Sequence, residues 1–149
     1  MRNTTLTVFV LASIFALSSI SWSEEITYRK HIKPVFDSKC MGCHGSESPE
    51  LPEFAKDKKR YKEMSKGPRM DSYTYLTSLI GWPDTGAIMR RLDDGKGTGK
   101  QGNMYQHLGS TEDERQQNLK LFKDWVGNWT LKKWKDITKE EMDGVKVKY

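Results

Sequence analysis

The feature that most constrains this chain is a pentapeptide, Cys40-Met41-Gly42-Cys43-His44. Two thiols three positions apart can add to the two vinyl groups of one haem. The histidine that follows is then held beneath the porphyrin, where its imidazole reaches the iron. One turn of chain thus presents three groups to one planar cofactor. The pattern predicts haem attached covalently to Cys40 and Cys43, with His44 as an axial ligand.

Three alternatives to haem attachment fit the rest of the chain poorly. A structural zinc site needs four ligands, and the sequence has no second cysteine pair. A thioredoxin-like Cys-x-x-Cys follows a strand in a βαβ unit, and this chain lacks that pattern. A plain disulfide between Cys40 and Cys43 leaves His44 without a role.

The composition also favours a fold that depends on a cofactor. The chain has 149 residues, of which 36% are hydrophobic, and its mean hydropathy is −0.76. Much of the aliphatic content lies in the first twenty residues, so the remainder has little material for a core. Such a chain needs a disulfide, a metal or a cofactor to fold. Length and hydropathy exclude multi-domain enzymes and multi-pass membrane proteins.

The first 23 residues have the pattern of a secretory signal peptide. Arg2 provides the positive charge that is usual near the N-terminus of a signal peptide, and residues 6–17 form its apolar run. The small residues Ser21 and Ser23 precede the expected cleavage site. An uncleaved anchor is the alternative, but the apolar run is short against the about 20 residues of a membrane span. We therefore expect cleavage before Glu24 and export, to the periplasm or otherwise beyond the cytoplasmic membrane.

The rest of the chain has the pattern of an all-α protein, with almost no strand-like alternation. Apolar spacing predicts helices over residues 28–39, 72–80, 85–92 and 111–129. Pro34 predicts a helix start or a kink within the first of these. Thr111 and Glu114 have the spacing of a capping box for the last helix, and Thr138 and Glu141 have it for a final short turn.

Two polar segments interrupt this pattern. Residues 47–69 hold seven basic and five acidic side chains. They predict a solvated surface insert with one helical stretch, or, in a sharper interpretation, a docking patch. Residues 132–149 are predicted to form a charged tail. The predicted organisation is therefore a cleaved signal over 1–23, one helical domain over 24–131 and the tail.

The motif and the helix order together resemble those of class I-type monohaem cytochromes c. In that family an N-terminal helix runs into Cys-x-x-Cys-His, and a middle helix, a methionine loop and a C-terminal helix follow. The counterparts here are residues 28–39, 40–44, 72–80, 102–109 and 111–129. The resemblance implies a small helical domain wrapped around one covalently attached haem c, which exchanges single electrons with partner proteins.

The same resemblance implies the second axial ligand of the iron. Met104 lies in a glycine-led loop seven residues before Thr111, where the family's ligand methionine lies. His107 is the main rival and would give bis-His ligation, Met70 is a second candidate, and an open sixth site is the remaining alternative. Arg90 and Arg91 are candidate partners of the haem propionates, because arginine suits carboxylates.

These features predict an exported electron carrier that is not an enzyme, with both axial sites of the iron filled. The net charge of +5 favours partners with acidic docking surfaces. A five-coordinate or bis-His haem protein that binds or reduces a small ligand is a second hypothesis. A haem subunit of a periplasmic oxidoreductase, docked through residues 47–69 or 132–149, is a third. We expect no nucleic-acid partner and no stable membrane insertion after signal cleavage.

Overall fold

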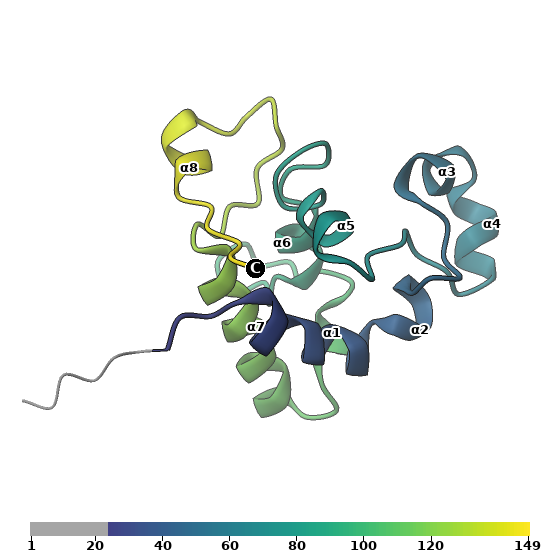
Figure 1. Cartoon of the computed structure of the whole chain (residues 1–149), viewed down its shortest axis with the longest axis horizontal. Coiled ribbons are helices and arrows are strands. Elements are labelled where there is room, and N and C mark those ends of the chain that lie inside the picture. The colour runs from purple at the N-terminus through teal and green to yellow at the C-terminus, as the bar shows by residue number, and fades with distance from the viewer. Residues whose placement is uncertain (1–23) are drawn as a thin grey trace, which may run out of the picture.

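The computed structural model describes residues 24–149, and the predicted signal peptide lies outside the described residues. In this part of the chain the elements are helices and one isolated bridge, between Gly127 and Val145 (Figure 1). In chain order they are a π-helix η1 (Tyr28–Ile32), α1 (Lys33–Lys39), α2 (Met41–His44), α3 (Leu51–Lys56), α4 (Lys58–Glu63), α5 (Tyr73–Thr77), α6 (Ala87–Leu92), a 3-10 helix η2 (Tyr105–Leu108), α7 (Glu112–Val126) and α8 (Lys139–Asp143). The prediction of an all-α fold is confirmed. Of the helices in residues 24–149, none is long and apolar enough to cross a bilayer.

The first predicted helix forms as η1 and α1, which run on without a break. The N–H of Lys33 bonds to the carbonyl of Tyr28, five residues back, so the first turn is wound as a π-helix. Pro34 follows directly and has no N–H to donate to a carbonyl of the preceding turn. The hydrogen bonding of this rod therefore changes from the π to the α pattern next to Pro34. Tyr28, Ile32 and Phe36 share one buried face of this rod.

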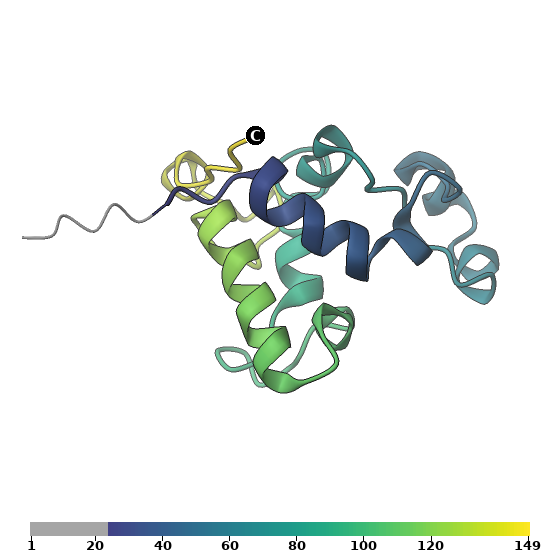
Figure 2. The same ribbon diagram turned by 60° about the horizontal axis from the view of Figure 1, so that its bottom comes forward.

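The longest helix, α7, packs across the start of this rod (Figure 2). Its buried face consists of Leu119, Phe122, Trp125 and Val126. An ion pair of 2.5 Å between Nζ of Lys39 and the carboxylate of Glu114 also joins the end of α1 to the start of α7. Apolar burial and this charge pair together fix the two helices against each other.

The cap of α7 differs by one residue from the predicted capping box. Oγ1 of Thr111 accepts the N–H of Glu114 at 3.2 Å, as the spacing predicted. The carboxylate of Glu114, however, accepts the N–H of Ser110 at 2.6 Å instead of that of Thr111. At α8 the predicted box is complete, with Thr138 and Glu141 each accepting the other's N–H.

The two middle helices are shorter than predicted. α5 begins after Ser72, whose Oγ accepts the N–H of Tyr75 at 3.2 Å, and it ends at Thr77. α6 begins only at Ala87, because Gly86 has a φ of 73°. That left-handed conformation favours glycine and makes the preceding residues a turn.

The 47–69 segment contains two short helices, α3 and α4, where the sequence predicted one helical stretch. Asp57 separates them and caps the second, since its Oδ1 accepts the N–H of Arg60 at 3.1 Å. No residue of either helix is buried. Figure 1 shows this α3–α4 hairpin projecting from the body beside α2.

The end of the charged tail packs on the helical body, which its composition did not indicate. The carbonyl of Lys148 accepts the backbone N–H of Tyr28 at 2.8 Å and Nε1–H of Trp125 at 2.7 Å. The N–H of Val147 bonds to the carbonyl of Trp125 at 3.0 Å, and the hydroxyl of Tyr73 donates to the carbonyl of Val147 at 2.6 Å. We call residues 145–149 the C-terminal clamp, because they join η1, α5 and α7.

Aromatic rings complete the C-terminal clamp. Tyr149 stacks on Tyr28 with ring centroids 5.9 Å apart and meets Tyr73 edge-on at 5.1 Å. The guanidinium of Arg29 lies 4.3 Å from the centroid of the Tyr149 ring and donates to its hydroxyl at 2.7 Å. The end of the predicted tail is therefore part of the fold.

Candidate haem-attachment site

The Cys-x-x-Cys-His motif forms one tight turn at the end of α1. Cys40 ends α1, and the N–H groups of Cys43 and His44 both bond to its carbonyl, at 3.2 and 3.0 Å. Both thiols are free. Cys40 packs against the core, and burial raises the pKa of its thiol to about 11, whereas Cys43 is exposed. The turn thus presents one thiol at the edge of the core and one at the surface.

The imidazole of His44 is held through one of its two nitrogens. Its Nδ1 lies 2.7 Å from the carbonyl oxygen of Pro68, a contact in which Nδ1 carries the proton and donates. Nε2 has no hydrogen-bond partner among the described residues and keeps its lone pair free. Burial lowers the pKa of this ring, which favours the neutral form that a metal ion requires. A carbonyl on the second nitrogen is the arrangement that orients ligating histidines.

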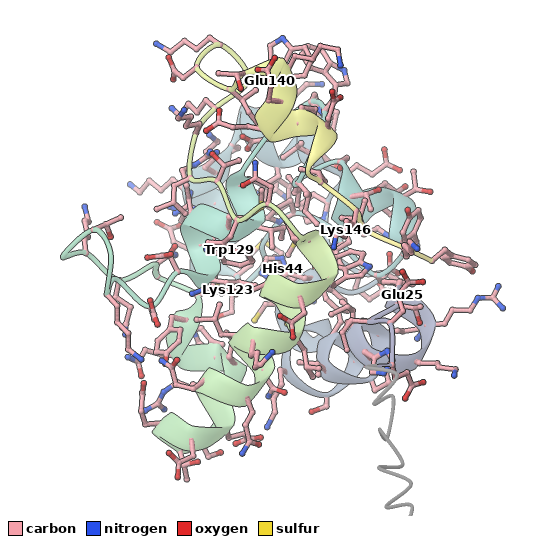
Figure 3. All side chains as sticks on the ribbon, turned by 90° about the vertical axis from the view of Figure 1, so that its left-hand side faces the viewer. Glu25, His44, Lys123, Trp129, Glu140 and Lys146 are labelled. Atoms are coloured by element: carbon pink, nitrogen blue, oxygen red, sulfur yellow. The ribbon has the colours of Figure 1, made fainter. Side chains whose placement is uncertain are left out.

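The backbone of residues 67–70 wraps around the motif and fixes that contact. The N–H of Gly67 bonds to the carbonyl of Cys43 at 2.8 Å, and the N–H of Met70 bonds to the carbonyl of His44 at 2.9 Å. Figure 3 is viewed from the side opposite to α2, so His44 is seen behind the body of the molecule. Sequence reasoning did not identify Gly67 and Pro68 as part of the site. Their only signal was the Gly-Pro pair that closes the polar insert.

Met104 lies in a loop that is bonded to the end of α6. Its N–H donates to the carbonyl of Arg91 at 2.9 Å, and the N–H of Gly102 donates to the carbonyl of Asp93 at 2.8 Å. A Cβ on Gly102 would lie 2.3 Å from the carbonyl oxygen of Arg91, so only glycine allows this approach. The half-buried Met104 side chain packs against the core, and η2, which follows it, contacts α1.

Two further residues anchor this methionine loop. Tyr105 is fully buried, and its hydroxyl donates to the carboxylate of Glu112 on α7 at 2.6 Å. Nε1–H of Trp129 donates to the carboxylate of Asp93 at 3.2 Å, and Figure 3 shows Trp129 beyond the end of α7. The methionine loop is therefore joined to α7 through Tyr105, and Asp93, to which the loop is bonded, is joined to Trp129.

The rival ligands of the iron have different surroundings. Met70 is 8% exposed and belongs to the hydrophobic core, as does Met89, which is 0% exposed. His107 lies in η2 and is exposed. Its charge contributes, after burial, to the lowered pKa of His44.

The two candidate propionate partners differ in how many donors they have free. The guanidinium of Arg90 donates to the carbonyls of Thr85 at 2.8 Å, Leu131 at 3.3 Å and Lys132 at 3.1 Å, and to the carboxylate of Asp84 at 3.1 Å. These bonds give Arg90 a structural role. The exposed Arg91 donates from one Nη to Asn103 at 2.9 Å and keeps its other donors for a ligand, so it is the better candidate.

A helical body built on a Cys-x-x-Cys-His turn, with its histidine oriented by a carbonyl, defines a monohaem c-type cytochrome. Residues 27–149 match the family model described as PccH cytochrome c, and the chain belongs to that family. The solved structure of monohaem cytochrome PccH from Geobacter sulfurreducens is 57% identical. The alignment covers 85% of this chain and 100% of that chain, with a TM-score of 0.81. No curated protein matches this chain.

Membership of the family makes this protein an electron carrier with one covalently attached haem c. The match spans residues 47–69 and the residues after 131. The residues of the motif fit a haem c, because both thiols are free and Nε2 of His44 has no competing partner in the described part of the chain.

Proposed function

We propose that the protein is an exported carrier of single electrons whose haem is held by Cys40, Cys43, His44 and Met104. One observation carries the proposal: the bond between Nδ1 of His44 and the carbonyl of Pro68 at 2.7 Å, which leaves Nε2 for the iron. The bound haem supplies a one-electron couple between Fe(II) and Fe(III). The protein residues provide attachment, ligation and a rigid environment.

Each proposed residue has its own task. Cys40 and Cys43 would form thioethers with the two vinyl groups, which would fix the cofactor to the turn after α1. Nε2 of His44 would be one ligand of the iron. The thioether sulfur of Met104 would be the second ligand, and a soft ligand of this kind raises the reduction potential. With both ligands in place, an electron would pass without a substrate binding the metal.

Export is proposed from the first 23 residues. Cleavage before Glu24 would leave a chain that begins four residues before η1. Mass determination of the haem-loaded protein purified from a periplasm tests this directly. A mass that still includes residues 1–23 would contradict cleavage.

The proposed docking surface for acidic partners is the α3–α4 hairpin. Its side chains and residues 46–49, which begin two positions after His44, line a hollow of about 270 Å³. The exposed ammonium groups of Lys56, Lys58 and Lys62 have no ion-pair partner among the described residues. Unpaired cations beside the attachment turn would steer an acidic redox partner toward the haem edge.

Absorption spectra of the haem-loaded protein test the axial ligands. Oxidised, reduced and CO-treated reduced samples are compared for the wild type and for Met104→Ala, with Met64→Ala as the control. Met64 is 55% exposed and lies on the hairpin side of the molecule, so its loss changes no proposed ligand. The expected wild type is low-spin, has a methionine–iron charge-transfer band and binds no CO. In Met104→Ala the band disappears and CO binds.

Two variants distinguish the rival ligands. If the band survives in Met104→Ala and disappears in Met70→Ala, the sixth ligand is Met70. If the wild type lacks the band and His107→Ala changes its spectrum, ligation is bis-His. A high-spin wild type that binds CO at once contradicts the six-coordinate carrier and supports the ligand-binding hypothesis.

A further inference from the structure

Two tryptophan side chains form an exposed pair on the surface of the protein. Trp82, in the turn between α5 and α6, is 66% exposed, and Trp134, in the segment between α7 and α8, is 53% exposed. Their ring centroids are 5.3 Å apart at an interplanar angle of 73°. Large apolar rings that remain in water next to each other mark a surface that contacts something else.

The fold holds the two turns together rigidly. Arg90 bonds to Thr85 and Asp84 on the side of Trp82 and to the carbonyl of Lys132 on the side of Trp134. The backbones also approach closely, since a Cβ on Gly86 would lie 2.4 Å from the carbonyl oxygen of Lys132. These contacts between the two turns therefore fix the backbone positions from which the two tryptophan side chains extend.

Two lysines without an ion pair in the described part of the chain lie beside the tryptophan pair. Lys133 and Lys135 flank Trp134 in sequence, are exposed and form no ion pair within residues 24–149. The nearby carboxylate of Glu141 is neutralised by Lys132 at 2.7 Å, as Asp84 is by Arg90 at 3.1 Å. Asp136 and Glu140 are the two carboxylates of residues 130–143 without an ion pair among the described residues. The patch thus combines two amphipathic rings with two free ammonium groups.

We propose that Trp82, Trp134, Lys133 and Lys135 bind the protein peripherally to a membrane surface of anionic lipid. Tryptophan prefers the headgroup level of a bilayer, and lysines are attracted to anionic headgroups. Both rings lie in turns between helices, and the two hollows that we identify in the described residues are lined by other side chains. An exposed patch outside these hollows suits a flat lipid surface better than it suits a second copy of the chain, whose lysines would repel it.

Such binding would leave the haem-attachment turn accessible to redox partners. In Figure 1 the segment that joins α7 to α8 lies at the top, on the side of α8, whereas α2 lies at the lower right. The attachment turn at α2 would then lie on the side of the molecule away from the bilayer. The inference does not depend on which residue is the sixth ligand of the iron.

Co-sedimentation with vesicles tests this inference on the haem-loaded protein. Vesicles of phosphatidylcholine alone are compared with vesicles that contain a third phosphatidylglycerol. The wild type is expected to bind only the anionic vesicles, with a shift of tryptophan emission to shorter wavelength. Trp82→Ala/Trp134→Ala is expected to bind about tenfold more weakly or worse. Lys133→Ala/Lys135→Ala is expected to lose about fivefold per lysine.

Lys58→Ala/Lys62→Ala is the matched control, because it removes the same charge from the α3–α4 hairpin and is expected to keep wild-type binding. An unchanged visible spectrum shows that each variant has kept its haem site. The proposal is overturned if the wild type binds no vesicle, or if both lysine pairs weaken binding equally. It is also overturned if the tryptophan pair proves to hold a dimer, which sedimentation velocity would detect as a loss of dimer in Trp82→Ala/Trp134→Ala.

Discussion

Gly67 lies so close to the ring of His44 that a Cβ at this position would be 2.1 Å from Cε1 and 2.6 Å from Nδ1. Non-bonded atoms do not approach to that distance, so any side chain at this position would have to displace the ring of His44. The backbone of Gly67 is not in the left-handed region. Glycine is therefore needed here because there is no space for a side chain, and not because of its backbone conformation. The same backbone continues into the carbonyl of Pro68 that holds Nδ1 at 2.7 Å.

Gly67→Ala should therefore displace His44 and break its bond to Pro68. We expect a destabilisation of about 2 kcal/mol from overpacking. We also expect a partial shift of the spectrum toward high spin, because the ring is no longer oriented toward the iron. Denaturant unfolding and the visible spectrum of the haem-loaded variant measure the two effects.

Gly97→Ala is the control for this experiment. Nothing lies within 4 Å of a Cβ at Gly97, and it too lies outside the left-handed region. Its stability and spectrum should match those of the wild type. Wild-type behaviour of Gly67→Ala would show that His44 is not held as described.

The hydroxyl of Tyr73 provides a test of the C-terminal clamp. It donates to the carbonyl of Val147 at 2.6 Å, across 74 residues of sequence. Tyr73→Phe removes this bond and leaves the ring in place, so we expect a loss of about 1 kcal/mol in the free energy of unfolding. Tyr75→Phe is the matched control, because its hydroxyl bonds only to the exposed Glu50. Equal effects of the two variants would argue against the clamp as a stabilising contact.

Much of this fold could be predicted from local patterns. The five residues of the motif, the long helix before Gly127 and the cap at Thr138 each depend on neighbours in sequence. The π-wound turn before Pro34 also has a local cause. These elements agree with the structure because nothing distant overrides them.

The parts that could not be predicted depend on backbone carbonyls and distant contacts. The carbonyl of Pro68 that orients His44 has no signature in sequence, since every residue has a carbonyl. The clamp was hidden for a similar reason, because Lys148 contributes its carbonyl and not its charge. Arg90 is a candidate propionate partner because arginine suits carboxylates, and its bonds to the carbonyls of two distant turns have no signature in sequence.

The charge of the α3–α4 hairpin should govern how small redox reagents reach the haem. Lys58→Glu/Lys62→Glu is expected to slow oxidation by the anion hexacyanoferrate(III) by several fold at low ionic strength. The same change should speed oxidation by a cationic hexaammine metal complex. Both effects should fade as salt screens the charges. Stopped-flow rates over a range of ionic strength provide the measurement.

Lys133→Glu/Lys135→Glu is the control for the reagent experiment, because it makes the same charge change on the side of α8. It should alter the two rates little. If the two double variants behave alike, only the net charge matters, and the hairpin does not flank the haem edge.

Acid should weaken the fold partly through Glu112 at the start of α7. Hydrogen bonds from Tyr105 and then Gln116, together with Arg115, lower the pKa of this carboxyl from 4.5 to about 2. Because the pKa is lower in the folded chain than in the unfolded chain, the stabilisation is fully present above about pH 4.5 and is lost as the pH falls toward 2. The N-terminal end of the helix favours the same charged form.

Glu112→Gln removes this titration. The variant should be less stable than the wild type at neutral pH, and the difference should shrink as the pH falls through this window, because the wild-type carboxyl then becomes protonated too. Asp113→Asn is the control, since the carboxylate of Asp113 makes no hydrogen bond or ion pair in residues 24–149. Unfolding free energies at a series of pH values measure both variants. A constant difference between wild type and Glu112→Gln across the whole range would mean that the carboxylate of Glu112 does not contribute through its charge.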